Sequence, residues 1–212
     1  MTTIKSFCFG PFSENTYLLI NEDKKCWIID PGFYGQNERN LFVNYLEQNE
    51  IQPVRLLNTH CHLDHIFGND FLRKKYNLDL EIHQLEIPIL AAAPQIGRMY
   101  GVPLDEQKPA DLFIEDNAIL DFFGTQINVF LTPGHSPGSI CFYNKKEQFI
   151  IVGDVLFNGS IGRTDLPGGD YDTLISSIKN RLMVLEDDVE VYNGHGPKTT
   201  IGAERRSNPF LR

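Results

Sequence analysis

The residues with the clearest potential for chemistry lie in the segment 59–65, which reads THCHLDH. Three histidines and one aspartate follow directly after a short apolar run. Imidazole nitrogens and carboxylate oxygens are ligands that Zn²⁺, Fe²⁺ and Mn²⁺ accept. The segment therefore predicts a metal-binding site, and the simpler alternative is a polar loop with solvated histidines.

The spacing inside this segment suggests that its ligands divide between two metals. His60 and His62 are separated by one residue, so in extended backbone both point to the same face and can bind one ion. Asp64 and His65 lie in the turn that opens the next predicted helix, where they can reach a second ion. Asp64 is also placed to cap that helix, and the two roles are compatible. Cys61 alternates to the opposite side and is not counted as a ligand.

Three further candidate ligands lie at strand ends in the second half of the chain. His135 sits in a turn between two Pro-Gly pairs, which fixes its position. Asp154 follows an apolar strand, where a charge is costly unless it is paired or bound to a metal. His195 stands between two glycines. Each is weak evidence alone, but together with the segment 59–65 they complete two sets of metal ligands.

The elements that must position these residues form two successive β-then-α halves. Hydrophobic periodicity and turn residues predict the first half as strands at 3–9, 16–21, 25–29, 54–57 and 78–83 with helices at 36–49, 66–76 and 85–92. They predict the second half as strands at 111–114, 119–122, 126–131, 139–143, 148–152 and 189–192 with a helix at 171–185. The segments 94–109 and 158–170 are predicted loops. A sheet covered by helices in each half favours an α/β (α+β) fold, a four-layer αββα sandwich in one domain over residues 1–212.

Composition limits the classes of function. The chain has 212 residues, and its 42% hydrophobic and 22% charged content is ordinary for a globular protein. A formal charge of −9 disfavours nonspecific binding to nucleic acid or to anionic membranes. No transmembrane run or signal peptide is recognised, so a cytoplasmic protein is expected. The four scattered cysteines are expected to be small buried residues rather than disulfides.

The order HCHLDH, PGH, GD and GHG resembles the metallo-β-lactamase superfamily over nearly the whole chain. The resemblance implies two divalent metal ions, with zinc favoured and iron or manganese as alternatives. It implies that His60, His62 and His135 bind the first ion, that Asp64, His65 and His195 bind the second, and that Asp154 bridges the two.

Within that superfamily, an aspartate at position 154 points away from the lactamases that carry cysteine there. The segments GDVLF at 153–157 and GRTD at 162–165 resemble the glyoxalase II-like branch. The implied reaction is hydrolysis of a small acyl thioester such as S-lactoylglutathione by a metal-bridging hydroxide, with Asp64 and Asp154 orienting the nucleophile. Because the chain ends at Arg212, the expected match is to the short enzymes without the helical C-terminal region that holds glutathione.

Other functions remain open. A sulfur dioxygenase acting on glutathione persulfide shares the motifs and would hold one iron through His60 or a neighbour, His135 and Asp154. A nuclease is less favoured, because no basic arm is visible and the net charge is negative. A catalytically silent fold is disfavoured by the complete ligand set. The expected partner is a small-molecule substrate, and the oligomeric state is not readable from the sequence.

Three more residues carry two interpretations each. Arg163 either binds an anionic part of the substrate or forms an ion pair with Asp165 or Asp170. Asp30 either supports the ligands from beneath, as the resemblance implies, or simply forms an Asp-Pro-Gly turn. His83 is expected at a helix start or on the surface rather than lining the site.

Overall fold

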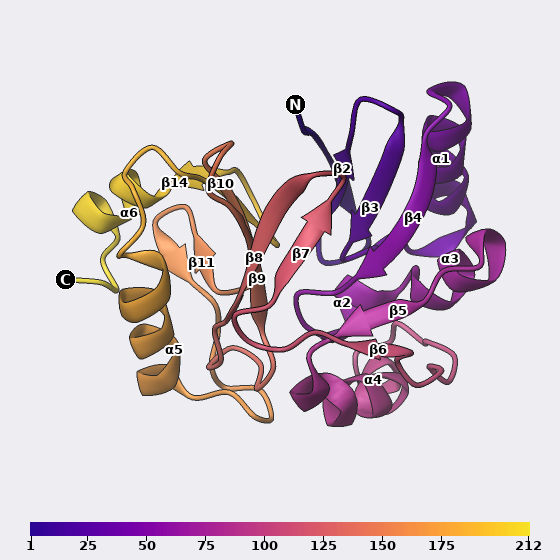
Figure 1. Cartoon of the computed structure of the whole chain (residues 1–212). Helices are drawn as coiled ribbons and strands as arrows, with labels where there is room; N and C mark the ends of the chain where they lie inside the picture. Colours follow the sequence, from indigo (N-terminus) through magenta and orange to yellow (C-terminus); the bar gives the residue numbers. More distant parts are fainter. The chain divides into compact units, whose positions relative to one another are not determined.

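The computed structural model describes all residues 1–212, and the chain folds into two compact units. The first unit combines residues Met1–Ile82 with Glu86–Phe113, and the second combines His83–Leu85 with Ile114–Arg212. Each unit has its own sheet and helices, which Figure 1 shows in colours that follow the sequence. The two units are described one after the other.

The first unit is built on a six-stranded sheet in the order β1-β2-β3-β4-β5-β6. β1, β2 and β3 are antiparallel neighbours, whereas β3 to β6 pair in parallel. The strands are β1 (Thr3–Phe9), β2 (Glu14–Ile20), β3 (Lys25–Ile29), β4 (Gln52–Leu57), β5 (Leu80–Ile82) and β6 (Leu112–Phe113). The parallel half matters most for function, because the ends of β3 and β4 lead directly into the Asp-Pro-Gly turn and the histidine segment.

Helices α1 (Gly35–Gln48) and α3 (Asn69–Tyr76) pack beside this sheet (Figure 1). α1 buries Phe42 and Leu46 one turn apart, and α3 buries Leu72, all within one hydrophobic core. The predicted helix 66–76 is in fact two, since a short α2 (Leu63–Ile66) ends before Gly68 and α3 begins after it. The close approach of Phe33 explains this break: a Cβ on Gly68 would lie 2.4 Å from that ring.

The helix α4 (Ile87–Met99) extends well past its predicted end and replaces much of the predicted loop 94–109. It follows a 3₁₀ turn at Gln84–Glu86 and contains Pro94, which argues against a helix from sequence alone. Leu90, Ala93 and Gly97 are buried at helical spacing, so packing of this face offsets the hydrogen bond that proline removes.

The second unit has a six-stranded sheet in the order β14-β13-β10-β9-β8-β7 and a separate two-stranded ribbon. The sheet strands are β7 (Ile119–Phe122), β8 (Thr125–Leu131), β9 (Ile140–Asn144), β10 (Phe149–Gly153), β13 (Glu190–Asn193) and β14 (Thr199–Thr200). β10 and β13 run parallel, and the other pairs are antiparallel. The ribbon of β11 (Leu156–Phe157) and β12 (Ser160–Ile161) occupies the start of the predicted loop 158–170.

The single helix predicted in the second unit, 171–185, is shorter in the structure. α5 (Tyr171–Ser177) begins after Asp170, whose carboxylate accepts the N–H of Thr173, and continues as a π-helical turn at Ile178–Leu182. α6 (Ile201–Ser207) was not predicted. It is stabilised by the Thr200 cap and by the buried Glu204, whose carboxylate accepts the N–H of Gly159 at 2.9 Å.

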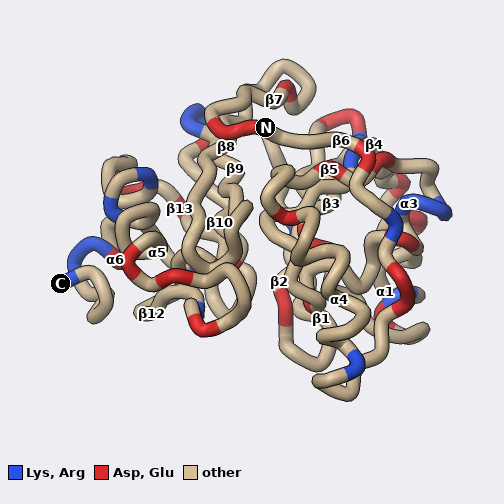
Figure 2. The backbone as a smooth tube through the Cα atoms, turned by 90° about the horizontal axis from the view of Figure 1, so that it is seen from below, with Lys and Arg blue, Asp and Glu red and all other residues tan.

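Two expectations from composition can be compared with the structure. Cys26, Cys61 and Cys141 are buried free thiols as predicted, whereas Cys8 is exposed. Acidic residues lie in the first turns of α1 and α3, and basic residues lie in the last turn of α3 (Figure 2). None of the helices combines the length and the apolar character that crossing a membrane requires.

Candidate metal centre

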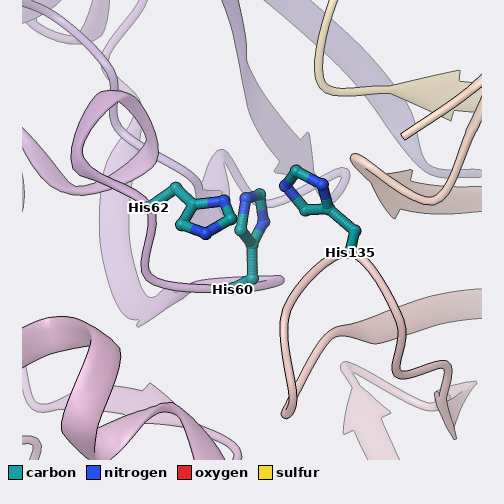
Figure 3. Close-up of side chains that lie close together, drawn as sticks. All are labelled: His60, His62 and His135. Atoms are coloured by element: carbon teal, nitrogen blue, oxygen red, sulfur yellow. The ribbon is translucent and has the colours of Figure 1, made fainter. Parts of the chain in front are cut away.

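In the first unit, the predicted ligands lie on the segment that leaves the carboxyl end of β4. His60 and His65 are fully buried, and His62 is half-buried. The ring centroid of His60 is 4.8 Å from that of His62 and 4.1 Å from that of His65. Figure 3 shows the imidazoles of His60 and His62 on one stretch of chain, and that of His135 on its own loop. Three of the four predicted ligands of this segment are thus brought together.

Asp30 supports this segment through both of its carboxylate oxygens. The carboxylate accepts the Thr59 N–H at 2.7 Å, the Thr59 hydroxyl at 2.6 Å and the Asn58 amide at 3.3 Å. It also lies 3.0 Å from Nδ1 of His65. Asp30 is buried and has a φ of 51°, in the left-handed region that aspartate tolerates better than most residues. It is therefore more than a turn residue, because it contacts one predicted ligand and holds the residue before another.

These hydrogen bonds determine which nitrogen of each imidazole can bind a metal. A carboxylate only accepts, so the Thr59 hydroxyl donates to Asp30 and its oxygen accepts from Nδ1 of His60 at 3.1 Å. Nδ1 of His65 donates to Asp30 in the same way. Both rings therefore carry their hydrogen on Nδ1 and keep the lone pair on Nε2, which is the arrangement found in metal-ligating histidines.

Glu14 is a second buried acid in this region, and no pattern in the sequence indicates it. Its carboxylate accepts the Thr16 hydroxyl at 2.9 Å and lies 3.8 Å from Nδ1 of His65. Burial raises the pKa of Glu14 well above its usual range. A Cβ on Gly32 would lie 2.0 Å from this carboxylate and 2.6 Å from the carbonyl oxygen of Asp64, so only glycine fits there.

The capping role predicted for Asp64 is wrong. The N-cap of α2 is His62, and no side-chain hydrogen bond caps that helix. Asp64 lies in the first turn instead, where its carboxylate is half-buried and 3.9 Å from Nε2 of His65. The carboxylate is thus near the Nε2 of its neighbour, the ring nitrogen that keeps its lone pair.

Cys61 faces away from the two histidines that flank it, as the alternation predicted. Its side chain belongs to the hydrophobic core of the first unit. Burial, and then the nearby carboxylates of Glu86 and Asp30, raise the pKa of this thiol well above its usual value. Its place in the hydrophobic core, and not beside the imidazoles, leaves Cys61 outside the ligand set. Its backbone N–H donates to the fully buried Glu86 carboxylate at 2.7 Å.

In the second unit, the three predicted ligands gather around one carboxylate. Asp154 follows β10, and its Oδ2 lies 3.6 Å from Nε2 of His135 and 3.4 Å from Nε2 of His195. β10 and β13 are parallel neighbours, which brings the residues after their carboxyl ends to the same edge of the sheet. Nδ1 of His135 lies 2.7 Å from the carbonyl oxygen of Arg163 and donates to it, so this ring also keeps the lone pair on Nε2.

Glycine allows the main chain to approach these ligands closely. A Cβ on Gly162 would lie 1.9 Å from the carbonyl oxygen of Asp154 and 3.2 Å from the Cβ of His135. Gly134, directly before His135, has a φ of 128°, and a Cβ there would meet the backbone of Leu174 at 2.3 Å. The second unit therefore positions its ligands largely through main-chain packing.

The structure shows the contacts of Arg163 and His83, and it does not test whether Arg163 also binds substrate. The Arg163 guanidinium forms a two-pronged ion pair with Asp165, at 2.7 and 2.8 Å, as one of the two interpretations predicted. Asp170 is not its partner but caps α5. His83 directly precedes the 3₁₀ turn, where its Nδ1 accepts the Leu85 N–H at 3.3 Å. The helix-start interpretation is correct, whereas a surface position is wrong because His83 is buried.

The ligand set fits a divalent metal. Imidazole nitrogens with fixed tautomers and nearby carboxylates supply the donor types that such ions accept. In the first unit alone, ligand atoms of Asp30, His60 and His65 lie within 4.8 Å of one another.

Comparison with known proteins identifies the family. The family model described as the metallo-β-lactamase superfamily matches residues 9–195. The chain belongs to the metallo-β-lactamase superfamily. It is 40% identical to a probable metallo-hydrolase of Bacillus subtilis, YqgX, over 95% of this chain and 94% of that protein. It is 38% identical to the hydroxyacylglutathione hydrolase GloC of Haemophilus influenzae, over 94% and 93%.

Solved structures of this superfamily confirm the predicted fold class. The B3 metallo-β-lactamase BLEG-1 superposes with a TM-score of 0.91 at 39% identity, and the match covers 99% of each chain. TTHA1623, solved in a di-iron-bound form, superposes with a TM-score of 0.88 at 34% identity over 98% of this chain and all of that one. The mixed α/β architecture is thus that of a metallo-β-lactamase.

Proposed function

We propose that this metallo-β-lactamase superfamily member is a binuclear hydrolase of small acyl thioesters, of the glyoxalase II type. The observation that carries the proposal is the 38% identity to a hydroxyacylglutathione hydrolase over nearly the full length of both chains. S-Lactoylglutathione, which hydrolysis would convert to lactate and glutathione, is the reference substrate. The expected partner is this small molecule rather than nucleic acid or a membrane.

The proposed ligand assignment follows the family pattern. His60, His62 and His135 would hold one ion, Asp64, His65 and His195 would hold the other, and Asp154 would contribute its carboxylate to both. The tautomers of His60, His65 and His135 support it, because each ring has its hydrogen on Nδ1 and its lone pair on Nε2. Zinc is the favoured metal. Iron is a real alternative, since the structure of TTHA1623 contains two iron ions.

Two bound divalent ions would supply a Lewis acid and lower the pKa of water toward neutrality. Asp64 and Asp154 have carboxylates that can orient that water and hold its proton. The sequence segments that carry the proposed ligands contain no dedicated general acid apart from the ligands themselves. A thiolate leaving group needs none, because the pKa of a typical thiol is about 8.5. This feature favours a thioester over an amide as the substrate.

Metal content and substrate preference test the proposal together. The protein, purified without added metal, is analysed by mass spectrometry for bound metals and assayed with S-lactoylglutathione, a lactone, a β-lactam and glutathione persulfide. We expect two ions per chain and the highest kcat/KM with the thioester. His83→Gln changes a histidine outside the ligand set and serves as the matched control. This variant should keep both the two bound ions and the preference for the thioester.

Two results would contradict the proposal in different ways. A single iron with oxygen uptake on glutathione persulfide would make the chain a sulfur dioxygenase. Preferential turnover of the β-lactam would make it a lactamase, the activity named for BLEG-1.

A further inference from the structure

Glu86 is a buried acid whose carboxylate accepts a backbone N–H from the ligand segment 59–65. It is the last residue of the 3₁₀ turn and occupies the N-cap position of α4, and its side chain is fully buried. Its Oε2 accepts the N–H of Cys61 at 2.7 Å. Cys61 is the residue between His60 and His62, so this hydrogen bond reaches the main chain midway between two proposed ligands of one ion.

The hydrogen bond fixes Cys61 from a second direction. Its thiol is already embedded in the hydrophobic core, with no exposed surface. Its N–H donates to a carboxyl oxygen in a buried setting, where leaving such a donor without an acceptor costs about 1–3 kcal/mol. With both groups held, the peptide planes on either side of Cys61 cannot rotate freely. The directions in which His60 and His62 leave the main chain are therefore restricted.

We propose that Glu86 is a positioning residue that orients His60 and His62 for metal binding by holding the Cys61 N–H between them. The proposal rests on the metal-binding part of the proposed function but not on the identity of the substrate. Glu86 acts through the backbone and is not itself a ligand.

A quantitative expectation follows from the behaviour of groups that support metal ligands. Removing such a group typically lowers metal affinity about 10–100-fold. Glu86→Ala removes the acceptor and leaves the Cys61 N–H buried. The metal affinity of this variant should therefore be about 10–100-fold lower than that of wild type. Glu86→Gln keeps an oxygen that can accept the same N–H, so it should recover most of the affinity.

A purely structural role would give a different pattern, and Glu38 provides the matched control. Glu38 lies in the same unit, and its carboxylate also accepts backbone N–H groups, from Gly10 at 2.9 Å and Tyr34 at 2.7 Å. Glu38→Ala should therefore lower the Tm of the metal-free protein without changing its affinity for metal. A merely structural Glu86 would behave in the same way.

The experiment titrates the metal-free full chain with Zn²⁺ against a chromogenic chelator and records the visible spectrum of the Co²⁺-loaded protein. We expect Glu86→Ala to bind the ions about 10–100-fold more weakly and to shift the Co²⁺ bands, with Glu86→Gln close to wild type and Glu38→Ala unchanged. If Glu86→Ala does not fold, Glu86→Met and Glu38→Met, which keep most of the side-chain volume but no acceptor oxygen, are compared instead. A weaker affinity and a shifted Co²⁺ spectrum in Glu86→Met alone are then expected.

Wild-type affinity and an unchanged Co²⁺ spectrum in a folded Glu86 variant that lacks the acceptor oxygen would overturn the inference. This outcome is distinct from a failure of the proposed function. If wild type binds two ions and Glu86→Ala weakens them, but S-lactoylglutathione is not hydrolysed, the positioning role holds and the thioesterase proposal fails. A wild-type chain that binds no Zn²⁺ or Co²⁺ would overturn both.

Discussion

The two units provide their ligands in different ways. In the first unit, four predicted ligands lie on one segment after β4, and buried carboxylates support it: Asp30 beside His65, Glu14 nearby and Glu86 on the Cys61 N–H. In the second unit, each ligand follows a different strand, and the main chain supports it through the Arg163 carbonyl and the close approach at Gly162. A contiguous segment needs side chains to hold it, whereas residues at strand ends are held by the sheet that bears them.

The largest effect is expected from a substitution in the second unit, which tests whether this unit is needed for metal binding and hydrolysis. Asp154→Ala removes the carboxylate that lies within 3.6 Å of both His135 and His195. Loss of a direct ligand should exceed the 10–100-fold typical of a supporting group, so we expect thioester hydrolysis to fall by more than about 100-fold. Mass spectrometry should show that one or both ions are missing. Unchanged activity and metal content would refute the ligand assignment.

The difference between the two units also explains which of the proposed ligands can be predicted from the sequence. The segment 59–65 is dense in donors, so its metal-binding character is visible without any structure. His135, Asp154 and His195 are single residues far apart in the chain, and only their common place after strands connects them. That placement is predictable, because apolar strands can be recognised and side chains that follow neighbouring strands meet at one edge.

What could not be predicted depends on contacts between distant segments. Glu14 and Glu86 are ordinary acids in the sequence, and nothing local shows that they are buried beside the ligand segment. α4 continues through Pro94 because its buried face packs well, which overrides the propensity that ended the predicted helix. α6 is a seven-residue helix whose stability depends on the buried Glu204 rather than on its own periodicity.

A smaller effect is expected from glycines that pack against each ligand-bearing chain. In the second unit, Gly162→Ala forces a Cβ into the carbonyl oxygen of Asp154, and in the first, Gly32→Ala forces one into the Glu14 carboxylate. Overpacking of this kind costs about 1–3 kcal/mol of folding free energy. We expect both variants to lose that stability in urea unfolding and to bind metal more weakly.

Gly124→Ala provides the control for this pair. Gly124 has a φ of 86° but open space around its Cβ position, so its variant carries backbone strain without a clash. It should be destabilised and yet bind metal as tightly as wild type. Full metal affinity in Gly162→Ala as well would contradict the view that main-chain packing positions the proposed ligands of the second unit.

The smallest effect is expected from Arg163→Ala, which separates the main chain of Arg163 from its side chain. Nδ1 of His135 donates to the Arg163 carbonyl, which any residue supplies, so metal affinity should not change. The guanidinium is engaged by Asp165, so we also expect an unchanged KM for S-lactoylglutathione. A KM that rises while kcat stays constant would instead support the predicted role of Arg163 in substrate binding.

The ion pair itself should be visible only in the pH dependence of stability. Arg163 lowers the pKa of Asp165 from an ordinary value of 3.8 to about 2. A carboxyl group with a depressed pKa in the folded state stabilises it above the unfolded pKa, and this contribution is lost as the pH falls toward the folded pKa. Wild type should therefore have a slightly higher Tm than Arg163→Ala above about pH 4 and the same Tm near pH 2. Because both side chains are exposed, 1 M salt should abolish the difference, and a difference that persisted would mean that the pair is more enclosed than its exposure indicates.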